Sequence, residues 1–183
     1  MANEKKLDCV ILGLLNDEEL TGYEIKKRID STLSMFWGAS YGSIYPTLSL
    51  LEENELATKI ETEENGRTKK VYTITEKGRI HLKQWLSLPI EKDELRYETL
   101  LKLFFGESVG PDTTIKHIES FEEKIKQKIP QLGSSINILE KIVHEDPAHI
   151  YYLLTAKFGM KVFNVYLEWC EEAKKILGVQ LHE

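Results

Sequence analysis

Apolar residues recur every three to four positions in three stretches near the start of the chain, which is the spacing of amphipathic helices. The first stretch spans residues 5–15. The second begins at or just after Thr21, because Thr21 and Glu24 have the spacing of a capping box, in which each side chain bonds a backbone amide that the helix leaves free. The third runs from about Ser40 to Asn54. The pattern therefore predicts three consecutive helices.

The third predicted helix has two contrasting sides. One side is apolar and carries Ile44, Leu48 and Leu51. The other side contains no lysine or arginine and consists mainly of small, hydroxyl-bearing and aromatic residues: Gly42, Tyr45, Pro46, Ser49 and Glu53. The ring of Pro46 faces the carbonyl of residue 42, a glycine near the free amino end, so we expect the helix to tolerate this proline.

After the third helix the period of the pattern changes from 3.6 to 2. Residues 57–63 and 69–75 alternate between apolar and polar, and Asn65–Gly66 between them is a strong hairpin signal. A helical pattern then resumes from about Thr75 to Leu86. These features predict a two-stranded hairpin with a charged tip, followed by a fourth helix.

No strand pattern is visible in the second half of the chain. Residues 95–105 are apolar nearly all round, which predicts a helix buried on several sides. Asp112 is expected to cap the next helix, whose apolar pattern continues through Pro130 and so predicts one kinked helix or two helices end to end. Asp146 and Pro147 provide an N-cap and a first-turn proline for a last long helix.

The last helix carries apolar residues close to a 3.5-residue repeat: Tyr151, Leu154, Phe158, Val162, Val165 and Trp169. Two helices of about 30 residues would each span roughly 45 Å, which is more than a small domain needs to cover its own core. We therefore expect this face to pack against a second copy of the chain in a two-fold dimer. The alternative is an aromatic lining for a small ligand, formed by Phe158 and Trp169 with Trp37.

Composition and length are those of a globular protein. The 183 residues are 42% hydrophobic and 30% charged. Cys9 and Cys170 have neither a disulfide nor a metal-ligand spacing, which indicates a reducing cytoplasm. Residues 31–51 lack charge, but their serines, threonines, glycines and proline argue against a membrane span. We expect a cytoplasmic protein with a domain at 1–88 and a helical domain at 89–183.

The charge distribution matters more than the net charge of −6. Residues 66–83 contain six lysines and arginines against one acidic residue, and the second predicted helix adds Lys26, Lys27 and Arg28. Clusters of this kind attract the phosphates of nucleic acids regardless of sequence, and the strength of this attraction should fall steeply with salt. The order of three helices, a hairpin with a basic tip and a further helix is typical of a winged helix-turn-helix domain, in which the third helix enters the major groove.

The sequence also resembles the PadR family of bacterial transcriptional regulators. The resemblance rests on the strings TGYEI at 21–25, GSIYPTL at 42–48 and GRTKKVYTITEKG at 66–78. The length and helical second half are similar to the subgroup with a long tail like that of the virulence activators. The resemblance implies a homodimer that binds a two-fold operator, often as a repressor, and that a small aromatic effector sometimes releases. Many relatives carry basic residues at Ser49 and Leu50, and a glycine at Glu55.

The fold class expected is therefore mainly α, with an N-terminal winged helix-turn-helix whose wing has two strands and a C-terminal all-helical dimerisation domain. The candidate DNA-binding residues are Tyr23, Lys26, Lys27, Ser40, Tyr41, Gly42, Ser43, Tyr45, Pro46, Ser49, Arg67, Lys69 and Lys70. Tyr45 could instead pack on the wing, Tyr23 could belong to the core, and Arg67 could be solvated.

Signals for catalysis or a cofactor are absent from the sequence. It contains no glycine-rich phosphate loop, nucleophile elbow or paired-histidine helix motif. His144 and His149 are five residues apart and do not share a helix face, so we expect neither a metal site nor a cofactor. The rival hypotheses are a winged-helix adaptor that binds protein without DNA and, less favoured, a small enzyme.

Overall fold

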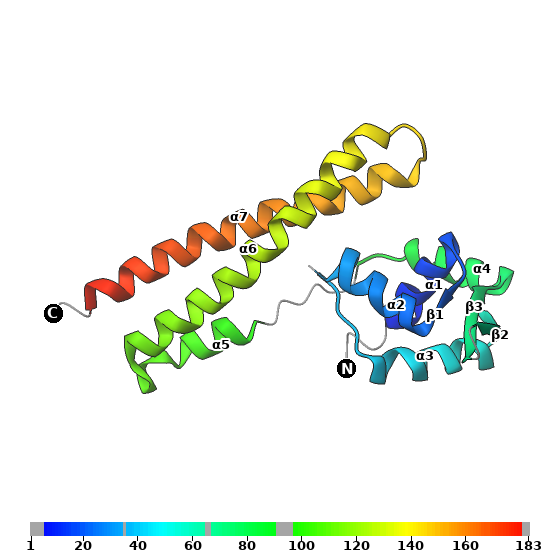
Figure 1. Ribbon diagram of the computed structural model, residues 1–183, viewed down its shortest axis with the longest axis horizontal. Helices are drawn as coiled ribbons and strands as arrows, with labels where there is room; N and C mark the ends of the chain where they lie inside the picture. The colour runs from blue at the N-terminus through cyan, green and yellow to red at the C-terminus, as the bar shows by residue number, and fades with distance from the viewer. Residues whose placement is uncertain (1–5, 35, 65–66, 91–96, 181–183) are drawn as a thin grey trace. The chain divides into compact units, whose positions relative to one another are not determined.

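A computed structural model of the chain describes residues 6–34, 36–64, 67–90 and 97–180 (Figure 1). The chain forms two compact units, Met1–Asp93 and Glu94–Glu183, which we describe separately. Among the described helices, none combines the length and the apolar character required to cross a lipid bilayer.

The first unit contains the four helices that the periodicity predicts. A π-helical turn extends the second of these helices at its carboxyl end. The first turn of the second helix has the expected capping box between Thr21 and Glu24. The bounds of these helices are α1 Leu7–Asp17, α2 Gly22–Arg28 with η2 Ile29–Leu33, α3 Tyr41–Glu53, and α4 Glu76–Leu86. The predicted inner side of α3 is confirmed, since Ile44 and Leu48 are fully buried in the core that α1, α2 and the sheet share.

The wing is an antiparallel hairpin of β2 (Ala57–Glu64) and β3 (Arg67–Ile74), which confirms the predicted change of period. A third strand, β1 (Leu20–Thr21), pairs with the other side of β3, so that the order in the sheet is β1-β3-β2. The sequence did not reveal β1 because a strand of two residues is too short to show alternation. Its pairing ties the start of α2 to the base of the wing.

The second unit is helical throughout its described part. It consists of α5 (Glu98–Phe104), a 3₁₀ turn η3 (Gly106–Ser108), α6 (Gly110–Ile142) and α7 (Ala148–Gln180). The two long helices form an antiparallel hairpin (Figure 1). Pro130 lies inside one continuous α6, which settles the choice between one helix and two. At the start of α7 the carboxylate of Asp146 accepts a hydrogen bond from the amide of Ala148 at 2.7 Å, so its predicted capping role is confirmed.

Two expectations for the second unit are wrong. The helix α6 begins at Gly110 and is preceded by Val109, so Asp112 lies inside the first turn and is not the N-cap. There its negative charge still favours the helix amino terminus. The helix α5 is not buried on several sides within the chain, because Leu101 and Phe104 are 60% and 83% exposed. It is only seven residues long and packs against α6, so its remaining apolar surface is left uncovered.

A buried ion pair and an aromatic cluster hold α6 and α7 together. Glu122 is almost fully buried, and it pairs with Lys174 of α7 at 2.7 Å and with Lys126 one turn along α6. Hydrogen bonds from these two ammonium groups lower the pKa of Glu122 to about 2. Near the same end, the ring of Phe121 lies 6.3 Å from that of Trp169 in an edge-to-face arrangement.

Candidate nucleic-acid interface

The outer side of α3 is exposed along its length. Tyr41 and Tyr45 are 43% and 48% exposed, and Gly42, Pro46 and Ser49 also face solvent. No charged group occurs on this helix before its last turn. Short, uncharged side chains at a helix amino end allow the backbone to approach another macromolecule closely. The structure therefore presents this part of the candidate site as one continuous surface.

The serine hydroxyls on α3 bond the helix itself. Ser43 Oγ accepts a hydrogen bond from the amide of Ser40 at 3.1 Å and donates one to the Ser40 carbonyl at 2.9 Å. Ser49 Oγ donates to the carbonyl of Tyr45 at 3.3 Å. The sequence predicts that these hydroxyls contact DNA, yet in the free chain they cap or support the helix. Base contacts by Ser43 would therefore require an exchange of hydrogen bonds.

Tyr45 is held by a small stack that joins α3 to α2. A Cβ atom on Gly22 would lie 2.6 Å from Tyr45 Cε1, so the absence of a side chain at Gly22 makes room for the ring. The rings of Tyr41 and Tyr45 stack with centroids 6.2 Å apart, and Lys26 Nζ lies 5.9 Å from the Tyr41 centroid. Tyr45 thus packs against α2 and keeps about half of its surface exposed.

The start of α2 lies beside this stack. Tyr23 is 62% exposed, which excludes its core interpretation within the chain. Hydrogen bonds from the backbone and hydroxyl of Thr21 lower the pKa of Glu24, and the charge of Lys69 on β3 adds to the effect. Lys69 is therefore electrostatically coupled to the first turn of α2 and remains exposed at the surface.

The wing carries its basic residues among acidic ones. Lys70 is exposed and lies opposite Glu61 in the β2–β3 register, with Lys70 Nζ 3.7 Å from Glu61 Oε1. The side chain of Arg67 and the predicted turn at residues 65 and 66 lie outside the described residues. Over the whole hairpin, residues 57–74, four basic residues stand against three glutamates.

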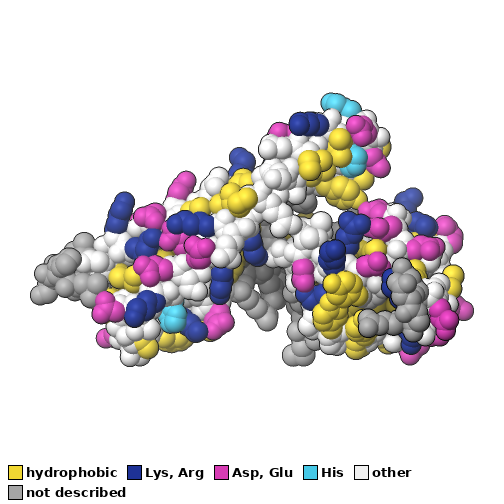
Figure 2. All heavy atoms as spheres, in the orientation of Figure 1, with side chains coloured by type: hydrophobic (Ala, Val, Ile, Leu, Met, Phe, Trp, Pro, Cys, Tyr) yellow, Lys and Arg dark blue, Asp and Glu magenta, His cyan; other side chains and the backbone are white. Residues whose placement is uncertain are grey.

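Carboxylates also pair with four other basic residues of this unit. Lys59 lies 3.0 Å from Glu52, and Lys77 lies 3.0 Å from Glu55. Lys26 pairs with Asp30, and Arg28 with Glu18. On the face visible in Figure 2, basic and acidic side chains alternate over this unit and form no single basic patch. The local excess of positive charge in the sequence is therefore reduced by carboxylate partners, most of which lie on other elements of the fold.

The predicted dimer face of α7 is an exposed apolar stripe. Tyr151, Leu154, Phe158 and Val165 are 57–68% exposed. Val162 and Trp169 are half-buried, and Trp169 contacts Phe121 within the same unit. A helix of this length with such a stripe is typical of a surface that another helix covers.

The fold and the surface of α3 define a transcriptional regulator with an N-terminal winged helix-turn-helix domain and a C-terminal helical domain. Residues 11–84 match the Transcriptional regulator PadR-like family, and residues 95–178 match the Virulence activator alpha C-term family. A Negative transcriptional regulator PadR from Bacillus subtilis is 30% identical over 172 residues, which are 90% of this chain and 93% of that protein. The chain belongs to the PadR-like family, as the resemblance of its motifs predicts.

Solved structures agree with this assignment over nearly the whole chain. The smu.1604c protein from Streptococcus mutans has a TM-score of 0.76 at 31% identity, with 96% of this chain and 98% of that chain covered. Bacillus subtilis PadR in complex with operator DNA has a TM-score of 0.71 at 29% identity, with 93% and 98% covered. The same Bacillus protein in complex with p-coumaric acid has a TM-score of 0.64 at 26% identity, with 96% and 97% covered.

Proposed function

We propose that this PadR-type regulator is a cytoplasmic repressor that binds a two-fold DNA operator as a homodimer. The observation that carries the proposal is the exposed, uncharged outer side of α3, which is held in place by the capping of Ser40 and the stack of Tyr45 on α2. A helix with this surface fits a major groove, where hydroxyl and aromatic groups contact base edges and sugar-phosphate. The name of the Bacillus relative as a negative regulator supports repression.

The wing and α2 would contact the DNA backbone on either side of α3. Lys69 and Lys70 are exposed on β3, and Lys27 is exposed on α2. Their ammonium groups would neutralise phosphates without reading the sequence, and Arg67 at the end of the wing is proposed for the minor groove. Because many neighbouring cations are paired with carboxylates, we expect only a few released counterions, and so a shallow dependence of affinity on salt.

Dimerisation would place two copies of α3 on one duplex. The exposed stripe Tyr151, Leu154, Phe158 and Val165, with Val162 and Trp169 beside it, supports a seam in which α7 packs on the second copy. Phe158→Arg should give a monomer in light scattering. Asn164→Arg changes an exposed residue of the same helix outside the stripe, and should leave the dimer intact. A dimer that survived Phe158→Arg would contradict this seam.

The DNA proposal is tested by fluorescence anisotropy with the chain's own upstream region. Lys69→Ala with Lys70→Ala should weaken binding to all sequences similarly and reduce the salt slope by about 1 to 2. Tyr45→Ala should instead change the ranking among operator variants. Lys175→Ala, at an exposed lysine of α7, is the matched control and should bind like the wild type. No binding at low ionic strength, or unchanged binding by both variants, would contradict the proposal.

A small aromatic acid is proposed as the effector, because one crystal structure of Bacillus subtilis PadR is of its complex with p-coumaric acid. Phe158 and Trp169 are the candidate lining on α7. Titration of the DNA complex with p-coumaric acid should release the DNA. Release at the same concentration from a Trp169→Leu variant would exclude Trp169 from the effector site.

The pairing of cations favours one second candidate function. A winged-helix domain in which several basic residues pair with its own carboxylates could serve as an adaptor that binds protein instead of DNA. The anisotropy titration decides between the two functions, since an adaptor would leave the DNA signal flat at low salt. We propose no catalytic role, in keeping with relatives that are transcriptional regulators.

A further inference from the structure

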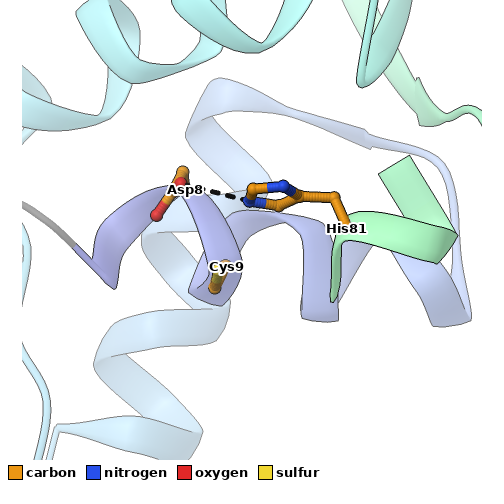
Figure 3. Close-up of side chains that lie close together, drawn as sticks. All are labelled: Asp8, Cys9 and His81. Atoms are coloured by element: carbon orange, nitrogen blue, oxygen red, sulfur yellow. Dashed lines mark ion pairs between the residues drawn. The ribbon is translucent and has the colours of Figure 1, made fainter. Parts of the chain in front are cut away.

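Three side chains that commonly bind metal ions meet where the first turn of α1 contacts α4 (Figure 3). Asp8 and Cys9 are consecutive residues of α1, and His81 reaches toward them from α4. A carboxylate oxygen of Asp8, the sulfur of Cys9 and a ring nitrogen of His81 all lie within 4.8 Å of one another. Each offers a different donor atom, so the cluster is not simply a group of acidic residues.

The hydrogen bonds of the free chain leave this cluster incomplete. Asp8 Oδ1 is buried and has no hydrogen-bond partner; among the described residues only Trp37 Nε1 shares this condition. A buried carboxylate oxygen without a partner is costly, and the other contact of this carboxylate inside the cluster is a hydrogen bond with the Cys9 thiol, which is a weak donor. The other oxygen, Oδ2, faces His81 Nε2 at 3.6 Å, which is too long for a hydrogen bond. Both carboxylate oxygens could therefore accept a stronger partner.

The distances suit a tetrahedral cation. Zinc bonds of about 2.0–2.3 Å place neighbouring ligand atoms of a tetrahedron roughly 3.5 Å apart. The 3.6 Å between His81 Nε2 and Asp8 Oδ2 already matches one such edge. The sulfur of Cys9 lies within 4.8 Å of both other donors, so side-chain rotation would be needed to bring it to this spacing. Three protein ligands would leave the fourth position to water.

Charge and access are consistent with a divalent cation. A bound dication would displace the thiol proton of Cys9 and balance the charges of one thiolate and one carboxylate. The side chains of Asp8 and His81 are 36% and 42% exposed, which leaves a path from solvent to the buried sulfur.

We propose that Asp8, Cys9 and His81 form a site for a divalent transition metal of zinc-like softness, which clamps α1 to α4 in the winged-helix unit. A thiolate, an imidazole and a carboxylate together are the donor set that Zn²⁺ and Co²⁺ accept in tetrahedral geometry. Binding would stabilise the folded unit, because the unfolded chain does not hold the two helices together. The site does not depend on DNA binding, so the two proposals can fail separately.

Cobalt(II) added to the full-length, reduced protein is the direct test. A tetrahedral site with a thiolate ligand gives a sulfur-to-cobalt charge-transfer band and strong visible bands, which an excess of Zn²⁺ should remove. Cys9→Ser should abolish the charge-transfer band. Cys170→Ser is the matched control, because Cys170 is the other cysteine of the chain and lies buried in the second unit. This variant should keep the band.

His81→Gln provides a second test that leaves the core cysteine in place. It should weaken cobalt binding by at least about tenfold, the lower end of the cost of losing even an outer-shell partner. His144→Gln, at an exposed histidine of the other unit, should bind cobalt like the wild type. Absence of the charge-transfer band in the wild type, its persistence in Cys9→Ser, or unchanged affinity of His81→Gln would each overturn the proposal.

Discussion

The turn after α3 places Glu55 in a conformation that suits glycine. Its φ angle is 60°, in the left-handed region, where the side chain of an L-residue crowds its own backbone. The amide of Glu55 bonds the Glu52 carbonyl at 3.0 Å, and the amide of Leu56 bonds the Leu51 carbonyl at 2.8 Å. This pair of bonds is the Schellman motif, whose left-handed position is usually glycine. The glycine expected here in relatives therefore has a structural reason.

Glu55→Gly should leave the winged-helix unit more stable than Glu55→Ala does. A residue with a Cβ loses about 1–2 kcal/mol of stability when it adopts the left-handed conformation. Glycine avoids this strain, but its greater freedom in the unfolded chain costs about 0.5–1 kcal/mol in return. Both variants lose the exposed ion pair with Lys77, which contributes at most about 1 kcal/mol. The alanine variant keeps the backbone strain. Glycine should therefore be about 0.5–1 kcal/mol more stable than alanine at this position.

Equilibrium urea unfolding of the wild type and both variants measures the difference. Comparison of glycine with alanine removes the contribution of the ion pair, and equal slopes against urea would indicate that the folded and unfolded states are otherwise unchanged. A shift of 1 kcal/mol corresponds to about 4–8 °C in the midpoint of a 60–100-residue domain, so thermal scans provide a second measurement. If the glycine variant were no more stable than the alanine variant, the strain at Glu55 would not be real.

Four further substitutions test contacts inside each of the two units. Gly78→Ala should destabilise the winged-helix unit by about 1–3 kcal/mol, because the new Cβ would lie 2.1 Å from the carbonyl oxygen of Leu56. In Gly13→Ala the new Cβ has no atom within 4 Å, so this variant should stabilise α1 by about 0.5–1 kcal/mol. Equal effects of the two alanine variants in thermal unfolding would contradict the close approach of Gly78 to the Leu56 carbonyl. Glu122→Gln should reduce the loss of stability that the wild type shows as the pH falls from about 4.5 towards 2, since the lowered pKa of Glu122 means that its ionised form stabilises the fold above that range. Melting temperatures across this range measure it, and identical profiles would be the contrary result. Thr21→Ala should cost about 1 kcal/mol through loss of the N-cap of α2, measured by urea unfolding; an unchanged midpoint would argue against that cap.

Most helices and both long strands could be predicted because their signals are local. The spacing of Ile44, Leu48 and Leu51 defined the buried side of α3, and the change from a 3.6- to a 2-residue period marked the wing. Short elements could not be predicted from the local pattern. For example, β1 has two residues and forms only through its pairing with β3. The exposure of α5 could not be predicted either, because an apolar sequence does not specify how many other elements pack against it.

The candidate DNA surface divides in the same way. Its uncharged helix face follows directly from residues 40–49, since one helix turns all of them in a known order. The electrostatic character of the surface could not be predicted in this way. Lys59, Lys70 and Lys77 lie beside carboxylates that are 7 to 22 positions away in the sequence. Local counting therefore overestimated the positive charge of the wing.

Periodicity, capping residues and the hairpin signal thus establish the winged helix and the helical second half, because each depends on residues within a few positions of one another. The stack of Tyr45 over Gly22, the left-handed turn at Glu55 and the meeting of Asp8 with His81 depend on helices and strands that only folding brings into contact. Such contacts join residues that are far apart in the sequence, so they leave no local pattern from which they could be predicted.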